Sequence, residues 1–109
     1  MVVDANRRIL ERLGYSVTST LDSCDALDIF TETPDAFDLV ITDMTMPHMT
    51  GAELSSELLK TKPDIPIILC TGYSYLITPE KAKAIGIREF VMKPFSWREI
   101  AETIRKVLD

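Results

Sequence analysis

The stretch FDLVITDMTMPHMTG, at residues 37–51, is the most informative part of this chain. Its first six residues form a nearly continuous apolar run, which is typical of a parallel strand covered on both faces. The run delivers one carboxylate, Asp43, to its end, and a short loop then leads to Gly51, where a helix is expected to begin. An acid at the carboxyl tip of a buried strand lies where an open α/β sheet places its functional groups.

Strand patterns and amphipathic helices alternate along the rest of the chain. In chain order the predicted elements are a strand at 15–20, a helix capped by Asp22 or Ser23, the strand at 37–42, a helix from Thr50 or Gly51, a strand at 65–70, a helix at 78–85, a strand at 88–92 and a helix at 97–108. Short connections between strands and helices indicate a parallel sheet wound on both faces. We therefore predict a single α/β domain, a three-layer αβα sandwich around a parallel sheet of four or five strands.

The number of strands depends on residues 1–13, which allow two interpretations. Apolar residues recur there at helical spacing, and Gly14 suits a helix C-cap, which favours a helix from the start of the chain. The opening MVVD also resembles the end of a short strand that terminates in an acid, Asp4. Both interpretations place a helix that runs into Leu13.

Composition excludes several classes of protein. The chain has 109 residues, enough for one hydrophobic core, and no apolar run approaches the roughly 20 residues that a membrane span needs. The net charge is −5, and no Lys or Arg occurs between Arg12 and Lys60, which argues against direct binding of nucleic acid. Cys24 and Cys70 lack metal-ligand spacing, so we expect reduced thiols of a cytoplasmic protein. His48 is expected to lie exposed in a loop.

Three polar side chains follow the ends of three predicted strands, namely Asp43, Thr71 and Lys93. Because the carboxyl ends of parallel strands meet at one edge of a sheet, we expect these side chains to lie together. Their charges suggest roles: Asp43 as a nucleophile or metal ligand, Thr71 as a hydrogen-bond donor to an anion, and Lys93 as the cation that neutralises it.

From Leu10 onward the chain resembles the receiver domains of two-component response regulators. Four marks carry the resemblance: D-x-x-M-P at 43–47, the glycine eight residues after the acid at Gly51, the pair Thr71-Gly72, and the pair Lys93-Pro94. Each mark alone is weak, but the four occur in the right order and at the right strand ends. The resemblance implies the flavodoxin-like topology of receivers over residues 1–109, with the N-terminal strand and first helix shortened or partly missing.

The resemblance also implies roles for individual residues. Asp43 corresponds to the phosphoacceptor, and Lys93 corresponds to the lysine that pairs with the phosphoryl group. The peptide bond between this lysine and the following proline, here Pro94, is usually cis in the family. Thr71 corresponds to the switch hydroxyl and Phe90 to the switch aromatic. A receiver catalyses at most its own phosphorylation and slow dephosphorylation.

Receivers hold Mg²⁺ with carboxylates and a backbone carbonyl, which here correspond to Asp43, the carbonyl of Thr45 and Asp4. The family normally has two adjacent acids at the end of its first strand, whereas here Ala5 follows Asp4, and too few residues separate Asp4 from Gly14 for a full first helix. Three explanations are consistent with the sequence. The first strand is kept and about two turns of the first helix are deleted, or the first strand is absent, or residues are missing. The Mg²⁺ site is expected to be weakened.

The function implied by the resemblance is phosphoryl transfer from a histidine kinase or phosphotransfer protein to Asp43, which switches a protein-interaction surface. That surface would be built from residues 78–85, 88–92 and 97–108. A degenerate receiver that binds proteins without phosphorylation is the alternative. A homodimer, a stand-alone regulator and a piece of a hybrid kinase all remain open at this point.

Overall fold

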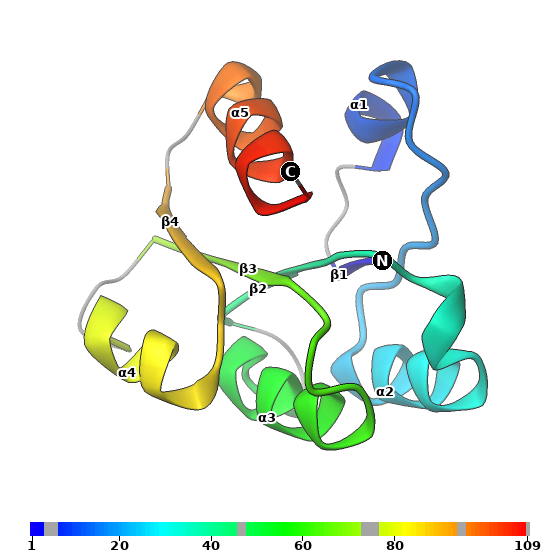
Figure 1. The fold of residues 1–109 in the computed structure, drawn as a ribbon, viewed down its shortest axis with the longest axis vertical. Helices are drawn as coiled ribbons and strands as arrows, with labels where there is room; N and C mark the ends of the chain where they lie inside the picture. Colours follow the sequence, from blue (N-terminus) through cyan, green and yellow to red (C-terminus); the bar gives the residue numbers. More distant parts are fainter. Residues whose placement is uncertain (4–6, 46–47, 73–76, 94–95, 109) are drawn as a thin grey trace.

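A parallel sheet in the order β1-β2-β3-β4 forms the centre of the computed structural model, which describes residues 1–3, 7–45, 48–72, 77–93 and 96–108. Its strands are β1 (Val2–Val3), β2 (Val40–Asp43), β3 (Ile67–Thr71) and β4 (Glu89–Met92). The helices are α1 (Arg7–Arg12), α2 (Ser23–Glu32), the 3-10 turn η1 (Pro34–Ala36), α3 (Gly51–Thr61), α4 (Pro79–Ile85) and α5 (Trp97–Leu108). Figure 1 shows α2, α3 and α4 on one face of the sheet and α1 and α5 on the other, which confirms the three-layer αβα sandwich.

Burial on both faces explains the apolar runs. All five residues of β3 are buried, and successive side chains of a strand point to opposite faces. Ile67 and Leu69 accordingly pack in the core cluster that includes Phe30 and Leu58, while Ile68 and Cys70 pack in the second cluster, on the α5 side. A strand covered twice must be apolar at nearly every position, as the sequence pattern predicted.

The interpretation of the chain start as a helix from its first residues is wrong. Val2 pairs in parallel with Ile41 and Val3 with Thr42, so the first strand is present, and α1 is a helix of six residues. The backbone N–H of Ile41 donates to the carbonyl of Met1 at 2.8 Å. Helical spacing is a local signal, and this long-range pairing with β2 overrides it.

The strand predicted at residues 15–20 is also wrong, because only Ser19 makes an isolated bridge there. Tyr15 and Val17 do pack against the core, and Ser16 and Thr18 are exposed, so the alternating pattern was real. The edge strand β1 has only two residues, however, and offers a neighbouring segment few backbone groups to pair with. The segment therefore forms no ladder with the sheet.

The short α1 leaves room beside the sheet. A cavity of about 540 Å³ is lined by residues that include Leu10 of α1, Ile104 of α5 and Tyr15 and Val17 of the following segment. A longer first helix would cover more of this face.

Candidate functional site

Three neighbouring strands end at the same edge of the sheet and bring the predicted site residues together. Asp43 ends β2, Thr71 ends β3, and Lys93 directly follows β4. The backbone pairing continues past the strand ends, because the N–H of Met44 donates to the carbonyl of Cys70 and the N–H of Lys93 to the carbonyl of Thr71, both at 2.8 Å. These bonds fix the relative positions of the carboxyl ends of β2, β3 and β4, as expected for neighbouring parallel strands.

An ion pair joins two of the predicted residues. Lys93 Nζ lies 2.8 Å from Asp43 Oδ1, with side-chain exposures of 40% and 21%. Both side chains are partly exposed, so the pair is expected to contribute at most about 1 kcal/mol to folding stability. Its importance is positional, because it holds a cation against the carboxylate at the end of β2.

A cavity of about 320 Å³ opens beside this ion pair. Its lining residues come from the ends of the three strands, and they are Asp43, Met44, Thr45, Cys70, Thr71, Gly72 and Lys93. Thr71 is buried, with 3% of its surface exposed, whereas Thr45 is exposed. Residues that carry a carboxylate, a hydroxyl and an ammonium thus line one small volume, which suits an anion that reacts with the carboxylate.

Gly51 allows α3 to begin directly against the end of β2. A Cβ at this position would lie 2.2 Å from the carbonyl oxygen of Asp43 and 2.7 Å from Cδ1 of Leu69. The N–H of Gly51 donates to the carbonyl of Met44 at 2.8 Å, which closes the loop. Close backbone approach, and no special backbone angle, is the reason that a glycine occupies the eighth position after Asp43.

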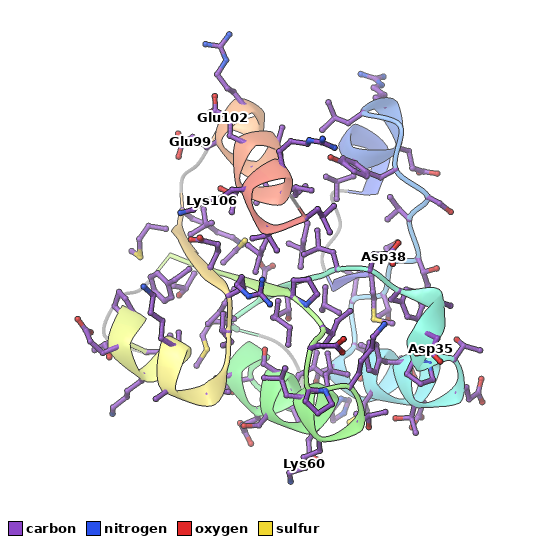
Figure 2. The ribbon with its side chains drawn as sticks, viewed as in Figure 1. Asp35, Asp38, Lys60, Glu99, Glu102 and Lys106 are labelled. Atoms are coloured by element: carbon purple, nitrogen blue, oxygen red, sulfur yellow. The ribbon has the colours of Figure 1, made fainter. Side chains whose placement is uncertain are left out.

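Phe90 lies on β4, opposite Leu69 of β3, and packs half-buried against the core. It does not line the cavity at Asp43 but a second one of about 410 Å³ between β4 and α5. Glu99, Glu102 and Lys106 of α5 line the same hollow, and Figure 2 shows them on the side of α5 near β4. Phe90 therefore lines a different hollow from the one that Asp43 lines.

The residues expected to hold Mg²⁺ are described only in part. Asp43 and Thr45 both line the cavity and offer a carboxylate and a backbone carbonyl, the oxygen donors that Mg²⁺ prefers. Asp4 lies outside the described residues, as does Pro47 of the D-x-x-M-P mark. Pro94 also lies outside them, and with it the peptide bond to Lys93 that was expected to be cis. The donor set that is described fits Mg²⁺, with Lys93 already on one carboxylate oxygen.

A polar cluster of Asp22, Cys24 and His48 was not predicted from the sequence. His48 Nδ1 lies 3.2 Å from Asp22 Oδ2, although the two residues are 26 positions apart and were assigned to a loop and a helix cap. The backbone N–H of Cys24 donates to the Asp22 carboxylate and lowers the pKa of that group below its usual value, with smaller help from His48. No sequence signal links these residues, because only the packing of α2 against the loop after β2 joins them.

Comparison with known proteins gives a consistent result. Residues 1–105 match the family model of the response regulator receiver domain. The chain is 35% identical over 102 residues to the sensor kinase CckA of Brucella abortus, which covers 94% of this chain and 11% of that protein. It spans 11% to 43% of the length of several curated relatives that it matches.

Two solved structures share the fold. A response regulator receiver domain protein from Clostridium thermocellum superposes with a TM-score of 0.87 at 31% identity, covering 94% of this chain and 81% of the other. The beryllofluoride-activated NtrC4 receiver domain dimer gives a TM-score of 0.82 at 29% identity, covering 93% and 82%. Within the described residues, no helix is long and apolar enough to cross a membrane.

Proposed function

The chain belongs to the response regulator receiver domain family of two-component signalling, and on that basis we propose that Asp43 is the residue that accepts the phosphoryl group. Receiver domains are signalling domains and not enzymes in the ordinary sense. The observation that carries the proposal is the 2.8 Å contact between Lys93 Nζ and Asp43 Oδ1 at the edge of a cavity that Thr71 also lines.

The proposed reaction is a single displacement. A carboxylate oxygen of Asp43 attacks the phosphorus of a phosphohistidine, the P–N bond breaks, and an acyl phosphate forms on Asp43. Phosphoryl transfer depends mainly on positioning and on neutralising the charge spread over the phosphoryl oxygens. Lys93 supplies a fixed cation for that charge, and the Thr71 hydroxyl supplies a hydrogen-bond donor.

Receiver domains generally use Mg²⁺, and in this chain the Asp43 carboxylate and the Thr45 carbonyl would hold it. The ion supplies neutralisation of the phosphoryl oxygens when it is bound. Asp4 is a third candidate ligand from the sequence. Because Ala5 stands where the family has a second acid, we propose that the affinity for Mg²⁺ is lower than in receivers with both acids.

The proposal extends to the whole chain and its partners. Residues 1–109 would form one receiver domain that takes its phosphoryl group from a histidine kinase or a phosphotransfer protein. Phe90 would transmit the change to the surface of α4, β4 and α5, where the hollow between β4 and α5 lies. The likeness to the NtrC4 receiver dimer supports a homodimer as one assembly. A cytoplasmic location is part of the proposal, because free thiols such as Cys24 and Cys70 are common in reducing compartments.

Chemical phosphorylation tests the proposal. The protein is incubated with acetyl phosphate, with and without Mg²⁺, and its intact mass is measured; beryllofluoride serves as a second, non-covalent probe. We expect one phosphoryl adduct that requires Mg²⁺, that is lost in Asp43→Asn and that forms more slowly in Lys93→Ala.

The matched control is Asp35→Asn, which changes a fully exposed acid of the same charge and should form the adduct at the wild-type rate. An adduct that persists in Asp43→Asn would place the acceptor elsewhere. If folded wild-type protein forms no adduct and binds no beryllofluoride, the chain acts instead as a degenerate receiver, through protein contacts alone.

A further inference from the structure

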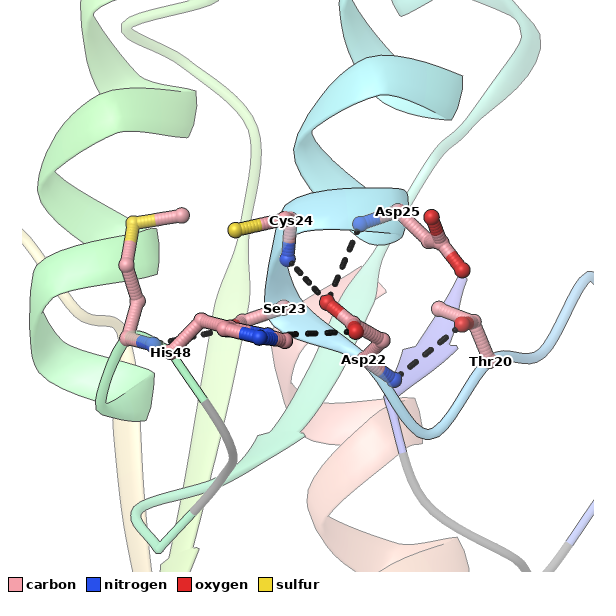
Figure 3. Close-up of polar contacts among 7 residues, drawn as sticks. Thr20, Asp22, Ser23, Cys24, Asp25 and His48 are labelled. Carbon is pink, nitrogen blue, oxygen red and sulfur yellow. Dashed lines mark hydrogen bonds and ion pairs between the residues drawn. The ribbon is translucent and has the colours of Figure 1, made fainter.

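A second group of metal-ligating side chains lies outside the Asp43 cavity. Asp22, Cys24 and His48 each place one ligand atom within 4.8 Å of the other two. Figure 3 shows the three side chains together at the start of α2. None of the three lines the cavity that holds Asp43 and Lys93. A carboxylate, a thiol and an imidazole from two distant segments therefore converge at a separate point.

The backbone already holds the ligand atoms near their places. Asp22 is the N-cap of α2, and its Oδ1 accepts from the N–H groups of Cys24 at 2.8 Å and Asp25 at 3.4 Å. This directs the other oxygen, Oδ2, toward His48. The N–H of Met49 donates to the hydroxyl of the fully buried Ser23 at 3.0 Å, which ties the loop carrying His48 to the start of α2.

The distances suit tetrahedral coordination. Zinc lies about 2.0–2.2 Å from nitrogen and oxygen ligands, so two such ligands at a tetrahedral angle are about 3.3 Å apart. The observed separation of His48 Nδ1 and Asp22 Oδ2 is 3.2 Å. The three ligand atoms lie within 4.8 Å of one another, whereas a tetrahedral site separates sulfur from nitrogen by about 3.6 Å, so the Cys24 sulfur has to move closer. Cys24 is exposed, so a rotation of its side chain can supply that change.

The donor set selects the metal. A thiolate with an imidazole suits Zn²⁺ and its transition-metal neighbours, whereas Mg²⁺ requires oxygen ligands. The cluster and the proposed Mg²⁺ site at Asp43 therefore differ in chemistry as well as in position.

We propose that Asp22, Cys24 and His48 form a Zn²⁺ site with three protein ligands and a fourth position open to solvent. Binding replaces the proton on the coordinating nitrogen of His48 and the thiol proton of Cys24, and any such proton leaves to solvent. The metal would cross-link the start of α2 to the loop that follows Asp43, because His48 lies five residues after Asp43 in that loop. None of the three ligands is a residue of the proposed phosphorylation site.

Metal titration of the metal-free protein tests the site. Zn²⁺ binding is measured by calorimetry in reducing buffer with millimolar Mg²⁺ present, and Co²⁺ is added separately to detect the absorption of a cobalt–thiolate bond. We expect one Zn²⁺ per chain, a higher thermal unfolding midpoint with Zn²⁺, and a thiolate band with Co²⁺. Loss of an outer-shell partner typically costs 10–100-fold in metal affinity, and Cys24→Ser or His48→Gln should cost roughly that or more.

Two variants separate this site from nonspecific binding of Zn²⁺ to neighbouring acids. Asp25→Asn removes the neighbouring acid that is not in the cluster and should bind Zn²⁺ as the wild type does. Asp43→Asn should also bind Zn²⁺ as the wild type does, because Asp43 is not a ligand of this site. The phosphorylation proposal and the Zn²⁺ proposal can therefore fail independently. Equal Zn²⁺ affinity in wild type and in the Cys24→Ser/His48→Gln double variant would overturn the assignment, as would displacement of Zn²⁺ by millimolar Mg²⁺.

Discussion

Gly51 begins α3 against the backbone of Asp43, so Gly51→Ala is expected to damage the stability of the fold and the geometry of the site together. A Cβ at this position would lie 2.2 Å from the Asp43 carbonyl oxygen, and contacts below 3.0 Å are essentially never found for real Cβ atoms. The gap between these values, 0.8 Å, is the least that α3 or the end of β2 must move. The obstructing atom belongs to the main chain and cannot rotate away.

Two opposing contributions set the size of the effect on stability. Overpacking a closely packed site costs typically about 1–3 kcal/mol, and an immovable backbone oxygen places this case at the upper end. Alanine returns up to about 1 kcal/mol through its better helix propensity, so the net loss is about 2 kcal/mol. An unfolding entropy of about 2.1 cal/mol/K per residue gives about 0.23 kcal/mol/K for 109 residues, and the unfolding midpoint should fall by about 9 °C.

Thermal unfolding followed by circular dichroism measures the loss, and acetyl phosphate labelling at a temperature where the variant is folded measures the damage at Asp43. The matched control is Gly72→Ala, in the same site, where the nearest atom to an added Cβ is Lys93 Cβ at 4.0 Å. This control should be neutral or more stable by up to about 1 kcal/mol. A Gly51→Ala midpoint no lower than that of Gly72→Ala, with normal labelling, would show that the close contact does not constrain this position.

Three further substitutions test other parts of the structure. Lys93→Ala should slow labelling of Asp43 and change the unfolding midpoint little, because a partly exposed ion pair contributes about 0–1 kcal/mol to stability. Lys93→Arg should restore part of the labelling rate. Unchanged labelling in Lys93→Ala would show that the lysine takes no part in the mechanism. Leu58→Ala should lower the free energy of unfolding, measured with denaturant, by about 2–5 kcal/mol, because Leu58 is fully buried. Leu21→Ala, at a residue that is 66% exposed, should lower it by less than about 0.5 kcal/mol. Similar losses in the two variants would contradict the burial of Leu58. Thr50→Ala should lower the stability by about 1 kcal/mol through loss of the capping box that begins α3, and Thr50→Ser should keep it; equal midpoints for the two variants would show that the cap does not matter.

The polarity of parallel strands made the main site predictable. The apolar runs at 37–42 and 65–70 indicated strands covered on both faces, and the polar residue after each run marked its carboxyl end. Strands β2 and β3 each include that polar residue, Asp43 and Thr71, as their last member. Once neighbouring strands run in the same direction, their ends must meet, so the proximity of these residues and Lys93 follows from the strand order alone.

Local patterns failed where distant pairing decides the outcome. Residues 1–13 carry helical spacing, yet Val2 and Val3 pair with β2, about 40 residues away in the sequence. Residues 15–20 carry a strand pattern, yet only Ser19 makes an isolated bridge there. In both cases the available backbone partners, and not the intrinsic preference of the segment, set the structure.

The amino-acid sequence was sufficient to predict the αβα sandwich, the family, and the strand ends that hold Asp43, Thr71 and Lys93, because these depend on the period of apolar residues and on the order of short motifs. The folded structure was needed to show that Lys93 contacts Asp43 directly, that Gly51 is required by a backbone oxygen, and that Asp22 and Cys24 meet His48. These are contacts between residues that lie on different elements of the chain. Their distances depend on how helices pack against strand ends to within an ångström, and periodicity carries no information on that scale.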